Sequence, residues 1–183
     1  MSQQNDIQNP NLDPANELPW IKWAKSKLGL KEIIGTKHNP EILDWVKELG
    51  GTWRDDETPW CGTFVAIALK RGSRAISKSF AWAKSYLNYS TKLTKPCYGC
   101  IGVMGRAGGG GHVTFIVGKT RDGSLVCLGG NQGNQVCLAK YPVSRFLGFV
   151  FPEKVDGSKS SPADYRYDLP IYNGNLTTVT SEA

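Results

Sequence analysis

Long apolar runs are absent from this chain of 183 residues. No stretch approaches the roughly 18 to 20 apolar residues of a membrane-spanning helix, and the mean hydropathy is −0.33. The first residues, MSQQNDIQNPNLDPANELP, contain neither a basic start nor an apolar segment, so no secretory signal is visible. We therefore expect no membrane span, and we expect synthesis in the cytosol.

A basic run interleaved with aromatic residues, which is typical of a nucleic-acid groove, is also absent from the sequence. The net charge of +6 and the pI of about 9.1 suit an anionic partner, either nucleic acid or an acidic cell-wall polymer. Because the basic residues are scattered along the chain, we predict a partner other than nucleic acid. The sequence contains no internal repeat.

Five cysteines in a chain without a visible signal favour free thiols over a disulfide framework: Cys61, Cys97, Cys100, Cys127 and Cys137. Cys97 and Cys100 form a CxxC motif, which is either half of a zinc site, a redox pair or two plain thiols. A second zinc pair would need Cys127 and Cys137, whose spacing by nine residues is unlike that of a zinc knuckle. We predict no metal and no cofactor.

Apolar residues recur at helical spacing in the first half of the chain. Asn39 is a predicted N-cap, Pro40 fits the first helical position, and Gly50 is expected to end that helix. Gly72 is expected to close a later helix. The predicted helices cover residues 19–33, 40–49, 59–71 and about 79–89.

The second half of the chain changes to short β-branched and aromatic runs that Gly, Asp and Asn turns separate. The runs are YGCIGVMGR, HVTFIVGK, SLVCLGGN, NQVCLAKY and RFLGFVFP. We predict an α+β fold, in which N-terminal helices pack on a C-terminal antiparallel β-sheet. The predicted organisation is a flexible segment at 1–17, one domain at 18–153 and a polar tail at 154–183.

A single cysteine stands near the start of the third predicted helix, in the stretch TPWCGTFVAIALKRG. With Thr58 as N-cap and Pro59 in the first position, Cys61 falls in the first turn. Unpaired backbone N–H groups and the helix dipole favour an anion there, so the pKa of the thiol is expected to fall and give a nucleophilic thiolate. The N–H of Cys61 itself is a candidate oxyanion donor. The alternative is a buried cysteine that only packs in the core.

Only two histidines are candidates for a base. His38 precedes a helix start and is expected on a surface loop, whereas His112 opens a predicted strand. A hairpin through Asp122-Gly123 pairs positions whose numbers sum to about 243, which sets His112 opposite Asn131 within one residue. The amide oxygen of Asn131 is then expected to accept a hydrogen bond from the imidazole. Cys61, His112 and Asn131 would form a catalytic triad.

Four neighbouring residues are candidate substrate-binding groups. Gly111 ends the glycine run RAGGGG, which either lets backbone approach a substrate closely or is simply a flexible loop. Gln132 either donates to an oxyanion or only ends a strand. Trp60 is expected to wall the cleft. Glu57 either supports the helix start electrostatically or contacts a substrate amine.

TPWC at a helix start, a strand-opening GHV, LGGNQ and the closing SRFLGFVFP follow one another in a characteristic order. In this order and spacing the chain resembles the papain-like CHAP and NlpC-type domains that cut bacterial peptidoglycan, in a branch common among phage endolysins. The resemblance covers about 20–152 and implies a papain-like fold, with Cys61 as nucleophile, His112 as base and Asn131 as third residue. Relatives often carry GD before the first strand, where this chain has Gly99-Cys100.

This resemblance implies a monomeric peptidoglycan hydrolase that cleaves an amide bond through a cysteine thioester and causes lysis. The enzyme is either an N-acetylmuramoyl-L-alanine amidase, which cleaves the bond between muramic acid and the first alanine, or an endopeptidase, which cleaves a bond within the stem peptide. Such an enzyme is made in the bacterial cytoplasm and reaches the wall after release, with a holin. The alternatives are a non-catalytic wall-binding module and another thiol enzyme of this fold, a transglutaminase or a deamidating toxin.

Overall fold

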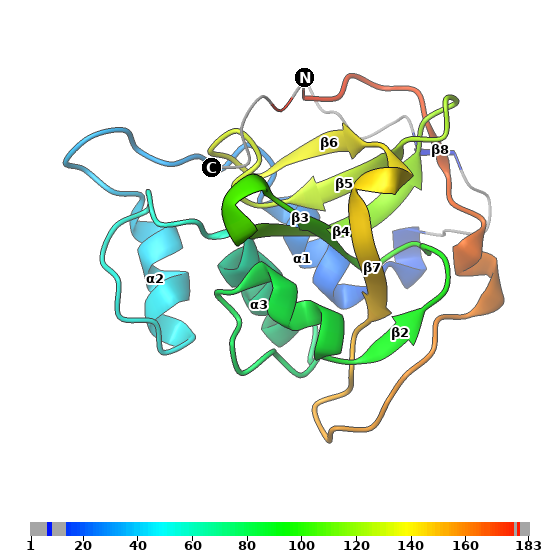
Figure 1. Cartoon of the computed structure of the whole chain (residues 1–183), viewed down its shortest axis with the longest axis horizontal. Helices are drawn as coiled ribbons and strands as arrows, with labels where there is room; N and C mark the ends of the chain where they lie inside the picture. Colours follow the sequence, from blue (N-terminus) through cyan, green and yellow to red (C-terminus); the bar gives the residue numbers. More distant parts are fainter. Residues whose placement is uncertain (1–6, 9–13, 178, 180–183) are drawn as a thin grey trace.

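The structure is a computed structural model that describes residues 7–8, 14–177 and 179 (Figure 1). Most of the segment predicted to be flexible, residues 1–6 and 9–13, lies outside the described residues. The architecture is α+β, as predicted. The α-helices are α1 (Pro19–Ser26), α2 (Pro40–Glu48) and α3 (Cys61–Arg71).

Helix α2 has the predicted start. The side chain of Asn39 accepts a hydrogen bond from the N–H of Glu41 at 3.0 Å, and Pro40 is the first helical residue. Helix α1 is shorter than predicted and ends at Ser26. Gly29 then has a φ of 89° and its N–H bonds to the carbonyl of Val136, so the chain turns away toward the sheet.

Helix α3 begins two residues later than predicted, at Cys61. Trp60 is its N-cap residue, and Thr58 lies outside the helix, where its N–H bonds to the carboxylate of Asp55 at 2.6 Å. The predicted N-cap role of Thr58 is therefore wrong. The fourth predicted helix is a 3₁₀-helix instead, η2 (Ala83–Asn88).

The five predicted strands are all present. They are β3 (Ile101–Gly105), β4 (Gly111–Lys119), β5 (Leu125–Gly129), β6 (Cys137–Tyr141) and β7 (Phe146–Phe151). Together with β2 (Thr91–Leu93) they form an antiparallel array in the order β2-β7-β3-β4-β5-β6. Two short strands, β1 (Ile7–Gln8) and β8 (Ile171–Tyr172), complete an eight-stranded sheet, and β8 runs parallel to β4.

The segment after residue 153, predicted as a polar tail, contributes to the same core. Leu169 and Tyr172 are buried, and the short helix η5 (Asp164–Tyr167) precedes them. The N–H of Tyr98 donates to the carbonyl of Arg166 at 2.8 Å. Side-chain packing and backbone pairing thus fix residues 164–172 against the sheet.

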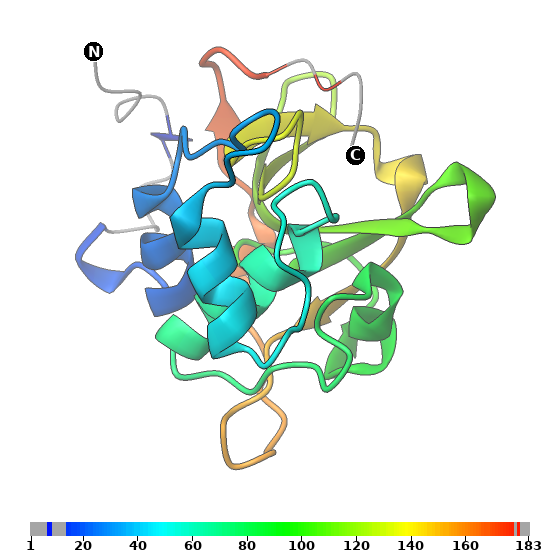
Figure 2. The same cartoon turned by 90° about the vertical axis from the view of Figure 1, so that its left-hand side faces the viewer.

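The helices are arranged around the strands that carry the candidate site (Figure 1). Helices α1 and α3 contact β5, α3 also contacts β4, and η2 packs on β3, β4 and β7. The β3–β4 hairpin projects from the body of the molecule (Figure 2). Within the described part of the chain, no helix combines the length and apolar character needed to cross a membrane.

Candidate active site

The fold brings Cys61 and His112 together, although 50 other residues separate them in the sequence. Cys61 is the first residue of α3, and His112 is the second residue of β4, the strand on which α3 packs. Both side chains are buried, with exposed fractions of 3% for Cys61 and 0% for His112. Cys61 is therefore almost completely shielded from solvent.

The pKa of the Cys61 thiol lies below its ordinary value. Burial alone raises this pKa, because it penalises the charged thiolate. The nearby imidazole of His112 opposes burial, and together with the backbone of Val113 and the charge of Arg106 it brings the pKa below the ordinary value. A thiolate beside an imidazolium is the pairing that activates a cysteine nucleophile.

The two ring nitrogens of His112 have separate roles. Nε2 lies 3.2 Å from Oε1 of Gln132, so in the neutral ring it carries the proton and donates to that oxygen. The hydroxyl of Thr114 donates to the same oxygen at 3.3 Å. Among the described residues Nδ1 has no hydrogen-bond partner of ordinary geometry, which leaves this nitrogen for the proton of the thiol.

The residue that orients the imidazole is Gln132, and the predicted contact with Asn131 is wrong. The predicted hairpin register, in which paired residue numbers sum to about 243, is confirmed at Phe115–Leu128 and Ile116–Cys127, the pairs of β4 and β5 nearest the site. Strand β5 ends at Gly129, however, and the chain then turns through Asn131 with a φ of 56°. This turn takes the side chain of Asn131 out of the ladder and lets Gln132 reach back to His112.

Gln132 is held so that its oxygen faces His112. Its Nε2 donates to the carbonyl of Cys137 at 2.8 Å and approaches that of Cys127 at 3.4 Å, which fixes the orientation of the amide. The side chain is fully buried. The amide donors of Gln132 point to backbone carbonyls, which argues against the first of its two predicted alternatives, that of an oxyanion donor.

Asn131 contacts the residue before α3 instead of His112. Its amide, oriented to suit its neighbours, donates to Oε1 of Glu32 at 3.0 Å and accepts from the N–H of Trp60 at 3.3 Å. Trp60 directly precedes Cys61, so Asn131 ties the end of β5 to the start of α3. Gly130 permits this contact, because a Cβ there would lie 2.5 Å from Cβ of Phe64.

For the wall cleavage that the sequence resemblance predicts, exchanging Gln132 for alanine is expected to lower the turnover number about ten- to a thousandfold, or 1.4 to 4 kcal/mol. The imidazole stays in place but loses the acceptor that fixes its orientation. Asn131→Ala, which removes the adjacent buried amide, is the matched control, with an expected loss below about tenfold. Initial rates on purified cell walls test this order, and a larger loss in Asn131→Ala would contradict the assignment.

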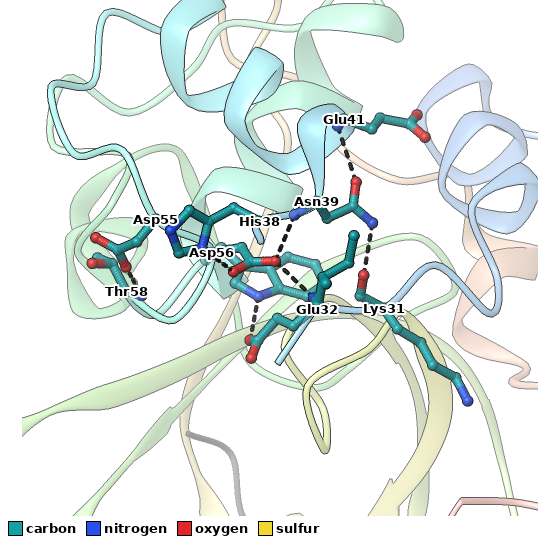
Figure 3. A network of polar contacts seen from close by, with 10 residues as sticks. Lys31, Glu32, His38, Asn39, Glu41, Asp55, Asp56 and Thr58 are labelled. Carbon is teal, nitrogen blue, oxygen red and sulfur yellow. Dashed lines mark hydrogen bonds and ion pairs between the residues drawn. The ribbon is translucent and has the colours of Figure 1, made fainter. Parts of the chain in front are cut away.

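Trp60 is buried in the core and does not wall a cleft, contrary to the sequence-based prediction. Its indole Nε1 donates to Oε1 of Glu32 at 2.6 Å (Figure 3). Burial raises the pKa of Glu32, the Trp60 hydrogen bond opposes this rise, and the charges of Asp56 and Glu57 add to it. Glu57 is exposed beside this cluster, and its predicted substrate contact stays a prediction.

Asp56 joins the loop before α3 to the loop before α2 (Figure 3). Its fully buried carboxylate accepts hydrogen bonds from the N–H of Ile33 at 2.9 Å, from the N–H of Asn39 at 2.8 Å and from Nδ1 of His38 at 3.0 Å. His38 therefore belongs to this structural network and not to the catalytic pair. Burial raises the pKa of Asp56, but the three hydrogen bonds outweigh it and the net shift is downward.

Asp56→Asn is expected to lower the free energy of unfolding by about 1 to 3 kcal/mol at neutral pH, since a buried acceptor becomes partly a donor. The pKa of Asp56 is lower in the folded state than in the unfolded state. The stabilisation of the fold by its ionised carboxylate is therefore fully present above the ordinary aspartate pKa, and it is lost as the pH falls through the folded-state pKa. Urea unfolding at several pH values measures this difference. Exposed Glu57→Gln is the control and should stay within about 0.5 kcal/mol of wild type.

The glycine run before His112 forms the projecting tip of the β3–β4 hairpin (Figure 2). Gly108 and Gly109 have φ values of 78° and 92°, which side chains rarely adopt. The carbonyl of Gly109 accepts a hydrogen bond from Nζ of Lys84 at 2.7 Å. Gly111 lies against Lys84 and Met104, because a Cβ there would approach both at about 3 Å. The predicted contact of Gly111 with a substrate stays a prediction.

The other cysteines are free thiols buried in the core. Burial raises the pKa of Cys100 and of Cys137, so these thiols are less reactive than Cys61. Sγ of Cys100 accepts a bond from the N–H of Cys97 at 3.4 Å, within the CxxC motif. Among the residues that the structure describes, no cluster of three or more His, Cys, Asp or Glu side chains could hold a metal ion.

Comparison with known proteins assigns this chain to no family. No family model matches the chain, and neither the curated proteins nor the solved structures contain a significant match.

Proposed function

We propose that the protein is a papain-like peptidoglycan hydrolase that cleaves an amide bond through a thioester on Cys61. The observation that carries the proposal is the activated thiol at the start of α3, whose pKa His112 lowers while Gln132 holds the other face of the imidazole. A nucleophile, a base and an orienting residue are the groups that acyl transfer needs. An intact set of this kind argues against a module that only binds the wall.

In the proposed reaction the Cys61 thiolate attacks the amide carbonyl, and the carbonyl oxygen becomes an oxyanion. The first hydrogen bond of α3 joins the N–H of Phe64 to the carbonyl of Trp60, so the N–H groups of residues 61–63 have no partner within the helix. The N–H of Cys61 is the proposed oxyanion donor. His112 then protonates the leaving amine, and a water molecule, deprotonated by His112, hydrolyses the thioester.

Peptidoglycan is the proposed substrate because the sequence resembles the wall-cutting papain-like domains and because the chain is basic. The net charge of +6 favours binding to an anionic wall polymer. Salt screens such attraction over a Debye length of about 8 Å at physiological ionic strength, so cleavage should slow as salt is added. In this proposal the protein acts as a monomer, is made in the bacterial cytoplasm and reaches the wall after release.

Release of soluble fragments from dye-labelled purified cell walls tests this class of activity. We expect release that EDTA leaves unchanged and that pretreatment with iodoacetamide abolishes, since the chemistry needs a thiolate and no metal. Loss of activity in EDTA with recovery in zinc would contradict the thiol mechanism and favour a metal role for Cys97 and Cys100.

A further inference from the structure

Two adjoining hollows lie on the surface beside the start of α3. One has a volume of about 270 Å³ and the other about 380 Å³, and they share Gly51, Thr52 and Trp53. The two hollows meet at these residues and are together called the aromatic groove below. Its other lining residues are Leu43, Asp44, Lys47, Gly50, Arg54 and 78–82.

Three aromatic residues line one end of the aromatic groove. The rings of Trp53 and Phe80 have centroids 6.0 Å apart with 31° between their planes, and the neighbouring Trp82 is 59% exposed. An exposed indole beside two further rings offers a flat apolar face on which a ligand can stack.

The segment that carries Phe80 and Trp82 lies against the start of α3. A Cβ on Gly62, the residue after Cys61, would lie 2.2 Å from the carbonyl oxygen of Phe80, so the two backbones are in close contact. The hydroxyl of Tyr86 in η2 donates to the carbonyl of Gly62 at 2.9 Å. A ligand in the aromatic groove would therefore lie next to the start of α3, where the nucleophile is.

We infer that the aromatic groove binds the glycan strand of peptidoglycan, an inference that rests on the proposed function. A sugar ring has an apolar C–H face that stacks on an indole and an edge of hydroxyl and amide groups that needs polar partners. Thr52 and Ser79 supply hydroxyls. The cationic side chains of Lys47, Arg54 and Lys78 outnumber the one acidic lining residue, Asp44, and suit the lactyl carboxylates that a strand without stem peptides carries.

Binding to peptide-free glycan strands tests this inference, measured by fluorescence titration with the Cys61→Ser variant so that no cleavage interferes. We expect Trp82→Ala to weaken binding about tenfold or more, the scale of one lost stacking contact. Trp82→Phe should restore most of the affinity, because it keeps a ring. Tyr165→Ala is the matched control, since Tyr165 is also exposed but lies outside the aromatic groove, and it should bind like its parent.

Failure of this inference and failure of the proposed function give different results. Wall cleavage without binding to peptide-free strands, or equal binding by Trp82→Ala and its parent, would overturn the glycan assignment and leave the hydrolase intact. Glycan binding that depends on Trp82 in a protein that cuts no wall would support the groove and overturn the hydrolase. Tighter binding of a single-stranded oligonucleotide than of glycan would also overturn the inference.

Discussion

Cys61→Ser is expected to lower the rate of wall-fragment release by about a thousandfold or more while leaving the fold intact. His112 favours the ionised form of the buried Cys61 thiol. A serine hydroxyl is far less acidic than a thiol, so it stays protonated beside the same imidazole. Release of dye from labelled walls gives the rate, and the melting temperature reports on folding.

Cys100→Ser is the matched control for this substitution. Cys100 is also a buried free thiol, and a serine hydroxyl there can still accept the hydrogen bond from the N–H of Cys97. The Cys100→Ser variant should therefore cleave walls at close to the wild-type rate, provided that it folds. Retention of more than a few per cent of activity by Cys61→Ser would show that the covalent thiol mechanism is wrong.

His112→Gln is expected to lower the cleavage rate about a hundred- to ten-thousandfold, the range for losing a general acid–base group. The pKa of Cys61 should also rise, since burial remains while the largest effect that opposes it is removed. In the wild type the thiolate persists to lower pH than an ordinary thiol does. The onset of alkylation by iodoacetamide should consequently move to higher pH in the variant.

Alkylation followed by mapping of the modified peptide separates this effect from simple unfolding. At neutral pH the wild type should be labelled at Cys61 before Cys100 or Cys137, whose pKa values burial raises. His38→Gln is the control, because His38 belongs to the Asp56 network, and its alkylation profile should match the wild type. An unchanged profile in His112→Gln would contradict the pairing of Cys61 with this histidine.

Much of the fold could be predicted because local signals and tertiary structure agree. The Asn39-Pro40 start of α2 depends on capping within one turn, and the five longer strands follow their hydrophobic runs. The hairpin register near the site follows from the position of the Asp122-Gly123 turn. Cys61 and His112 could be paired from sequence because the chain offers only two histidines.

The identity of the orienting residue could not be predicted to a single position. Whether Asn131 or Gln132 faces His112 depends on the turn after β5, where Gly130 packs against α3 and Asn131 adopts a positive φ. These are contacts between distant segments. The hydrogen bonds of Asp56 likewise could not be predicted from the sequence, because their partners lie 17 to 23 residues away along the chain.

The packing of residues 164–172 shows the same limit. This segment has no amphipathic period, yet Leu169 and Tyr172 are buried in the core, and Ile171 between them pairs with Lys119 of β4. Residues 83–88 form a 3₁₀-helix whose position is fixed by contacts with β3, β4 and β7. In both places tertiary packing, and not local propensity, decides the conformation.

Digestion of purified walls in water enriched in oxygen-18, followed by mass spectrometry of the soluble fragments, shows whether the protein hydrolyses an amide bond of the wall. Hydrolysis of a thioester on Cys61 predicts fragments that carry one oxygen-18 in a new carboxyl group, together with a matching new amine. The position of that carboxyl also states whether the amidase bond or a stem-peptide bond is cut. New reducing sugar ends, a new amide without oxygen-18, or no fragments at all from the folded wild type would contradict the account.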